Sequence, residues 1–198
     1  RATSMPSWAR TVMDERPKVA SSLAGRVPHA ASECRRCGTA LVGDIANTLD
    51  SLDTLRTECI DATLFHEFLG FDIEAADADN LVEPVSRQIA ERLNGRVKIR
   101  AAAHAPYSVS AELFCAIGRL PGPRSVHLAE SEEEVEFLLS GGGPWRNILE
   151  ERGRMSRAWV PPGLRPVDYL ESVGWLRDDT IAVHGVQLVG DEIGRLAQ

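Results

Sequence analysis

Histidine and glutamate side chains stand at the ends of strand-like runs in this 198-residue chain. His104 follows the third of five apolar runs, His127 lies within the fourth and His184 lies near the end of the fifth. Glu130 comes three residues after His127, so these two side chains leave the same strand end together. Three histidines on consecutive strands, one of them followed by a glutamate, indicate a shared site rather than three separate structural roles.

That combination suits metal-dependent hydrolysis. Imidazole is a good ligand for zinc or iron, and a bound divalent ion lowers the pKa of its water to about 7. A carboxyl group beside the water can take its proton and pass it to a leaving nitrogen. The spacing therefore favours His127 on the metal, Glu130 within reach of the water and His184 orienting that water.

Five short apolar runs predict the strands that position these residues. The runs are nearly continuous in apolar residues rather than alternating, which is typical of strands covered on both faces, as in parallel sheets. Functional side chains of parallel α/β folds gather at the carboxyl ends of the strands. The predicted strands are residues 39–45, 62–71, 97–103, 125–129 and 180–186.

Longer stretches with helical patterns separate the strands. In residues 80–94 apolar side chains recur every four positions, and residues 131–140 open with Ser131 and Glu134 spaced as in a capping box. Strands that alternate with helices predict a parallel α/β architecture of five strands and up to nine helices. The long insert 141–166 is expected to carry its own helix. The other predicted helices are residues 7–22, 28–37, 51–59, 111–120, 145–152, 166–173 and 191–197.

Composition excludes several classes of partner. The chain has 22 Lys and Arg against 29 Asp and Glu, a net charge of −7, and its basic residues are scattered, which argues against nucleic acid. No apolar run approaches the roughly 18 residues of a membrane-spanning helix. Four irregularly spaced cysteines favour a reducing, cytoplasmic location over a disulfide framework. Cys34 and Cys37 have the spacing of a metal or redox pair, but no second pair accompanies them, so we interpret them as incidental.

Three short motifs resemble the amidohydrolase superfamily, in its branch of cytosine deaminases, chlorohydrolases and adenosine-type deaminases. They are HAPYS at 104–108, HLAES with the acids that follow it at 127–134, and VHGV at 183–186. The stretches GTALVGDIANT at 38–48 and EFLGF at 67–71 are similar as well. The resemblance implies a (β/α)8 TIM-type barrel, with residues 1–198 forming a single incomplete barrel domain that covers about strands two to six.

The resemblance also implies roles for individual residues. His127 corresponds to the metal ligand on barrel strand five, Glu130 to the proton shuttle, and His184 to a contact with the water or the substrate. His104 and Glu67 correspond to substrate contacts. One divalent metal ion is implied, with zinc favoured over iron or manganese. Asp44 and Asn47, by contrast, are interpreted as structural.

The chain also departs from the family pattern. It contains no His-x-His pair, which the family carries on strand one, and no region matching strands seven and eight, the strand-eight aspartate or the flanking β-sandwich. Because the resemblance implies only His127 as a metal ligand in this chain, the 198 residues alone are expected to bind zinc weakly or not at all. Open strand edges are expected to recruit another chain, for example as a homo-oligomer.

The leading hypothesis is hydrolysis of a non-peptide C–N bond, deaminating a nucleoside, purine or related small heterocycle. A ring-substituent hydrolase such as a chlorohydrolase would use the same residues. A catalytically inactive barrel fragment that serves as a binding or assembly scaffold is the alternative from another class. A phosphate-binding barrel would need a Gly-rich loop at a helix N-terminus, and 141–145 is the one candidate, which we interpret as a turn.

Overall fold

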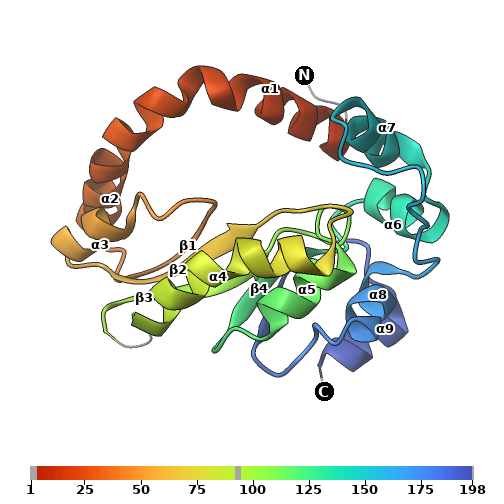
Figure 1. The fold of residues 1–198 in the computed structure, drawn as a ribbon. Helices are drawn as coiled ribbons and strands as arrows, with labels where there is room; N and C mark the ends of the chain where they lie inside the picture. The colour runs from red at the N-terminus through yellow and green to blue at the C-terminus, as the bar shows by residue number, and fades with distance from the viewer. Residues whose placement is uncertain (1–3, 92–94, 198) are drawn as a thin grey trace.

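A computed structural model describes residues 4–91 and 95–197, and its centre is a five-stranded parallel sheet. The strand order is the chain order, so each strand pairs with the one before it, as in the wall of a half-barrel (Figure 1). Register aligns the carboxyl ends: Phe68 pairs with Ala103, Ala103 with Val126, and Leu128 with His184. The strands are β1 (Leu41–Ala46), β2 (Asp61–Phe68), β3 (Val97–Ala103), β4 (Arg124–Leu128) and β5 (Thr180–His184).

Helices connect the strands and cover the sheet. Figure 1 shows α4, α5 and α8 on one side of the sheet, while α1 arches past the other side between α2 and α7. A short 3-10 turn, η1 (Ala24–Arg26), joins the first two helices. The helices are α1 (Met5–Leu23), α2 (Val27–Arg36), α3 (Leu52–Thr57), α4 (Ala75–Glu91), α5 (Ala111–Gly118), α6 (Glu132–Ser140), α7 (Gly143–Glu151), α8 (Pro166–Ser172) and α9 (Gly190–Leu196).

The main core lies between the sheet and the outer helices. Leu64 of β2 and Ile99 of β3 are fully buried there, as are Ile89 of α4 and Leu113 of α5. Burying a side chain of this size contributes roughly 1.5–3 kcal/mol. A second cluster joins α1 to α7 around Trp145. The first cluster packs the outer helices against the sheet, and the second includes Ala105 and Tyr107 of the segment that follows β3.

The five strands and nine α-helices confirm the predicted alternation within the described residues. The second strand ends at Phe68 rather than residue 71, and the helix predicted to begin at residue 80 begins at Ala75. Its predicted last residue, Asn94, lies outside the described residues. The insert after α6 carries α7, as expected.

The expectation that all five strands are covered on both faces is wrong for β1 and β5. Leu41 is 68% exposed and Ile181 is 46% exposed, whereas β3 and β4 are largely buried. Both exposed strands lie at the edges of the described sheet, with a neighbour on one side only. Apolar content alone does not distinguish an edge strand from a central one. Among the described residues no helix has the length and apolarity needed to cross a membrane.

Candidate active site

The sequence-predicted site residues meet at the carboxyl end of the sheet. Glu67 lies near the end of β2, His104 directly follows β3, His127 lies in β4 and His184 ends β5. The rings of His104 and His127 have their centroids 5.4 Å apart, and those of His127 and His184 are 5.0 Å apart. Glu130 follows β4 and joins this row through His184. The structure therefore brings all five predicted residues together.

Three of these residues form the one group of side chains that could hold a metal ion in the part of the chain that the structure describes, and we call it the metal-binding group. One potential ligand atom each from Glu67, His104 and His127 lies within 4.8 Å of the others. Nε2 of His127 is 3.5 Å from Oε1 of Glu67. Nδ1 of His127 is buried and has no hydrogen-bond partner among the described residues. Two imidazoles and a carboxylate are a donor set that suits zinc or iron.

The electrostatics of the three groups differ. Burial raises the pKa of the Glu67 carboxyl, but the hydrogen bond to His127, the nearby His104 and the amide of Asn47 outweigh it and lower the pKa overall. The hydrogen bond to Glu67 raises the pKa of His127 against the effect of burial. Burial is the main reason that the pKa of His104 is lowered. His104 is therefore held neutral, while Glu67 is held ionised.

A chain of hydrogen bonds orients Glu67. The side-chain amide of Asn47 donates to Oε2 of Glu67 at 2.9 Å, and Arg16 of α1 donates to Oδ1 of Asn47 at 2.7 Å. Asp44, by contrast, accepts a hydrogen bond from the Ser51 hydroxyl. The sequence interpretation of Asn47 as merely structural therefore missed its contact with the site. Its position directly after β1, at the same sheet edge as the histidines, was the available signal.

A hydrogen bond at ring nitrogen Nδ1 orients His104. Nδ1 of His104 lies 2.6 Å from the Ser108 hydroxyl oxygen, and that hydroxyl lies 3.2 Å from the Ala105 carbonyl oxygen. When Ser108 donates to the carbonyl, it accepts from Nδ1–H of His104, and Nε2 then keeps its lone pair. This tautomer, assigned from the hydrogen-bond network, leaves His104 able to accept a hydrogen bond or bind an ion.

Glu130 and His184 form a second pair beside the first cluster. Oε1 of Glu130 is 3.3 Å from Nε2 of His184. His184 has a φ of 79°, and Ala129, which precedes Glu130, has a φ of 51°. Both lie in the left-handed region that non-glycine residues rarely adopt. The turns after β4 and β5 therefore take unusual conformations where they present these two side chains.

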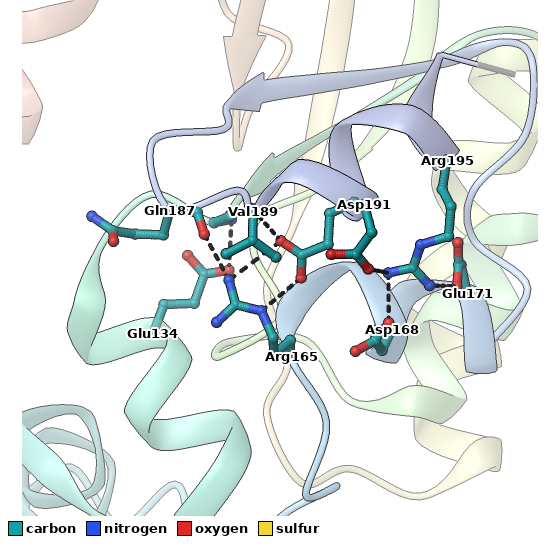
Figure 2. A network of polar contacts seen from close by, with 10 residues as sticks. Glu134, Arg165, Asp168, Glu171, Gln187, Val189, Asp191 and Arg195 are labelled. Carbon is teal, nitrogen blue, oxygen red and sulfur yellow. Dashed lines mark hydrogen bonds and ion pairs between the residues drawn. The ribbon is translucent and has the colours of Figure 1, made fainter.

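Backbone hydrogen bonds and a partly buried ion pair hold the two turns together. The N–H of Gly185 donates to the Leu128 carbonyl at 2.9 Å, and the N–H of Gln187 donates to the Ala129 carbonyl at 2.8 Å. Figure 2 shows Arg165 reaching from the start of α8 to this segment. Arg165 donates to the Gln187 carbonyl at 2.7 Å.

Glu192 of α9 completes this support. It accepts a hydrogen bond from Arg165 at 2.8 Å and another from the N–H of Val189 at 2.9 Å, and it is 1% exposed. The segment that follows His184 is therefore anchored to both α8 and α9. Neither Arg165 nor Glu192 belongs to the motifs that predicted the site.

A cavity of about 200 Å³ opens next to the cluster. Glu67, His104, Tyr107 and Ser108 line one side of it, and α1 and α7 supply most of its apolar lining. Trp8 of α1, which is 53% exposed, belongs to this wall. Sequence reasoning missed the wall, because nothing in the spacing of α1 shows which strand ends it faces. The residues of α1 that line the cavity are Met5, Trp8, Ala9, Val12, Met13 and Arg16.

Two other sequence features lie outside the site. Cys34 and Cys37 are exposed and free, and neither belongs to the metal-binding group. Gly141 ends α6 with a φ of 70°, packed against Trp159 and Pro161, and Gly143 begins α7, so the glycine run is the short turn between these two helices.

Comparison with known proteins found similarity to deaminases, although no protein-family model matches the chain. The 5'-deoxyadenosine deaminase of Methanopyrus kandleri is 28% identical over 177 residues, which cover 85% of this chain and 36% of that protein. The structure of Helicobacter pylori aminofutalosine deaminase in complex with methylthio-coformycin is similar with a TM-score of 0.85 at 22% identity. That match covers 98% of this chain and 48% of the other.

A more distant structural relative has a different reaction. A mutant of atrazine chlorohydrolase from Arthrobacter aurescens, solved with zinc and atraton, has a TM-score of 0.69 at 15% identity, covering 99% of this chain and 46% of the other. The chain thus spans less than half the length of each of these relatives. The chain is thus similar in sequence to a deaminase, and it has the half-barrel fold of these two solved structures over nearly all of its length.

Proposed function

We propose that the protein carrying this chain is a metal-dependent hydrolase that deaminates a purine nucleoside or a related small heterocycle. The observation that carries the proposal is the juxtaposition of the Glu67–His104–His127 group with the Glu130–His184 pair at one sheet edge. The similarity to a 5'-deoxyadenosine deaminase supports a nucleoside as the substrate class. The chain spans 36% of that relative, so the activity belongs to the whole protein.

His127 would hold the metal ion, with Glu67 and His104 within reach of it. Its unpartnered Nδ1 and the neighbouring carboxylate fit that role. A divalent ion bound there would supply a water of lowered pKa. Zinc is the ion we propose, because a structural relative was solved with it and the donor set suits it.

Glu130 is the proton carrier in this proposal. Its carboxylate takes a proton from the attacking water as the water oxygen bonds to the amine-bearing ring carbon. It then delivers that proton to the departing nitrogen, the C–N bond breaks and ammonia leaves. His184, 3.3 Å from Oε1 of Glu130, holds the carboxylate in place and faces the same water.

His104 and Glu67 contact the substrate, because both line the cavity between the strand ends and α1. His127 does not line that cavity. In this proposal the substrate therefore lies on the side of Glu67 and His104 that faces the cavity, and the metal ion lies on the side of His127. The apolar wall of α1, with the exposed ring of Trp8, suits a flat heterocycle.

A substrate panel tests the proposal on the full-length protein loaded with zinc. We expect ammonia release from adenosine or 5'-deoxyadenosine and no chloride release from atrazine. Chloride release without ammonia would contradict deamination and favour a ring-substituent hydrolase. Neither product, together with no bound metal, would favour a binding or assembly scaffold.

A further inference from the structure

Glu134 is a buried carboxylate whose hydrogen-bond partners differ from those that its sequence pattern predicts. It is the third residue of α6 and is 0% exposed, whereas Glu132 in the same turn is exposed. The hydroxyl of Ser131 accepts a hydrogen bond from the N–H of Glu134 at 3.3 Å, as a capping box requires. The reciprocal bond of a capping box would run from the Glu134 carboxylate to the N–H of Ser131.

The carboxylate reaches past Ser131 instead. Its Oε1 accepts the N–H of Ala129 at 3.1 Å, and its Oε2 accepts the N–H of Glu130 at 2.8 Å. Ala129 is the residue with a φ of 51°, a conformation disfavoured for a side chain with a Cβ. Both oxygens of Glu134 are thus committed to the backbone of the turn that presents Glu130.

Burying a carboxylate is costly unless charge-assisted bonds offset the loss of water. Burial raises the pKa of Glu134 to about 7, although the N–H groups of Glu130 and Ala129 act in the opposite direction. A glutamine or an apolar residue would fill the same space at lower cost. The carboxylate is the side chain at this position whose two oxygens can both accept from adjacent N–H groups.

We infer that Glu134 is a positioning residue that fixes the backbone of Ala129 and Glu130, so that the Glu130 carboxylate faces His184. The inference rests on the proposed function, because Glu130 is the proton carrier there. The same turn is tied to the segment after β5 through the Ala129 carbonyl, so a shift of the turn would also change the distance to His184.

The test compares Glu134→Gln with Glu132→Gln in the full-length protein. Gln presents an N–H₂ group to one of the two backbone N–H groups, so one bond is lost. We expect Glu134→Gln to lower kcat by about 10–100-fold, the range typical for residues that orient an active group. KM and metal content should stay unchanged, and Glu132→Gln should behave as wild type.

A double variant separates positioning from general structural damage. If Glu134 acts through Glu130, adding Glu134→Gln to a Glu130→Gln protein should lower kcat no further. Multiplying effects in the double variant, or a kcat for Glu134→Gln within about twofold of wild type, would overturn the inference. Should the Gln variant fail to fold, Glu134→Asp keeps the charge but is too short to reach both N–H groups. A wild-type kcat for Glu134→Asp would likewise overturn the inference.

Hydrogen exchange keeps this inference distinct from the proposed function. If the wild-type protein releases no ammonia from any substrate, the proposed function fails, but the backbone tie is still measurable. Glu134→Gln should speed amide exchange at Ala129 and Glu130, and Glu132→Gln should not. Unchanged exchange at both amides in Glu134→Gln would show that the carboxylate does not fix this turn.

Discussion

At the scale of single residues, the two neighbouring histidines His104 and His127, at the carboxyl end of the sheet, have pKa values that their surroundings shift in opposite directions. Glu67 raises the pKa of His127, whereas burial lowers that of His104. His104 lines the cavity beside α1, and His127 faces the carboxylate with a free Nδ1. These differences agree with the proposed roles, in which His104 contacts the substrate and His127 binds the metal ion.

Substitution of the two histidines should separate these roles. His127→Ala should lower metal occupancy, because it removes the proposed ligand, whereas His104→Ala should keep the metal and raise KM. His66→Ala is the matched control, since His66 lies in the same sheet but outside the metal-binding group. Elemental analysis and steady-state kinetics make the comparison. Equal metal loss in His127→Ala and His104→Ala would show that His104 is a metal ligand and would contradict its proposed role as a substrate contact.

The buried carboxyl of Glu134 predicts a pH dependence of stability. The pKa of Glu134 is about 7 in the folded chain, whereas the ordinary value is 4.5. Between these two pH values the folded state therefore keeps a proton that the unfolded state has lost. A raised pKa contributes stability that is present below pH 4.5 and is lost as the pH rises through 7. At 1.36 kcal/mol per unit, the free energy of unfolding should fall by at most about 3 kcal/mol across this window.

Denaturant unfolding between pH 4 and 8 measures that change. The decline should disappear in Glu134→Gln and persist in Glu132→Gln, whose side chain is exposed. A Glu134→Gln profile that runs parallel to wild type would show that Glu134 does not titrate in this range.

At the scale of elements, the site depends on short turns that helices hold from outside. The segment after β5 is anchored by Arg165 at the start of α8 (Figure 2) and by Glu192 of α9, and the turn after β4 is tied to α6. These helices contribute none of the five predicted side chains, but they fix the backbone that presents Glu130 and His184. A substitution at the start of α8 is therefore expected to affect the site indirectly, through the backbone that presents His184.

Arg165→Met should show how much this anchor contributes. It leaves the Glu192 carboxylate buried without its cation, which should lower the free energy of unfolding by about 2–3 kcal/mol. That is below the range for a fully buried pair, because Arg165 is partly exposed. Arg177→Met is the control: its pair with Asp179 is exposed, and losing it should cost less than about 1 kcal/mol. Equal effects in chemical denaturation would mean that the anchor is no stronger than a surface pair.

At the scale of the whole molecule, the sequence predicted the fold and the row of site residues for a simple reason. Parallel strands end at one edge, so a residue at the end of each run is placed by local pattern alone, as His104, His127 and His184 show. The exposure of β1 could not be predicted, because apolar content does not show which strands have two neighbours. The cavity wall on Trp8 could not be predicted either, because it depends on where α1 crosses the strand ends, which is a long-range property.

The most direct test of the account is the turnover of Glu130→Gln in the zinc-loaded full-length protein. Gln keeps the shape of the side chain but cannot cycle a proton, so kcat for ammonia release should fall by about 10²–10⁴-fold. Metal content and Tm should barely change, and Glu132→Gln should keep wild-type kcat. A near-normal kcat for Glu130→Gln with a slightly lowered Tm would show that Glu130 only stabilises the start of α6, and would contradict hydrolytic deamination through this residue.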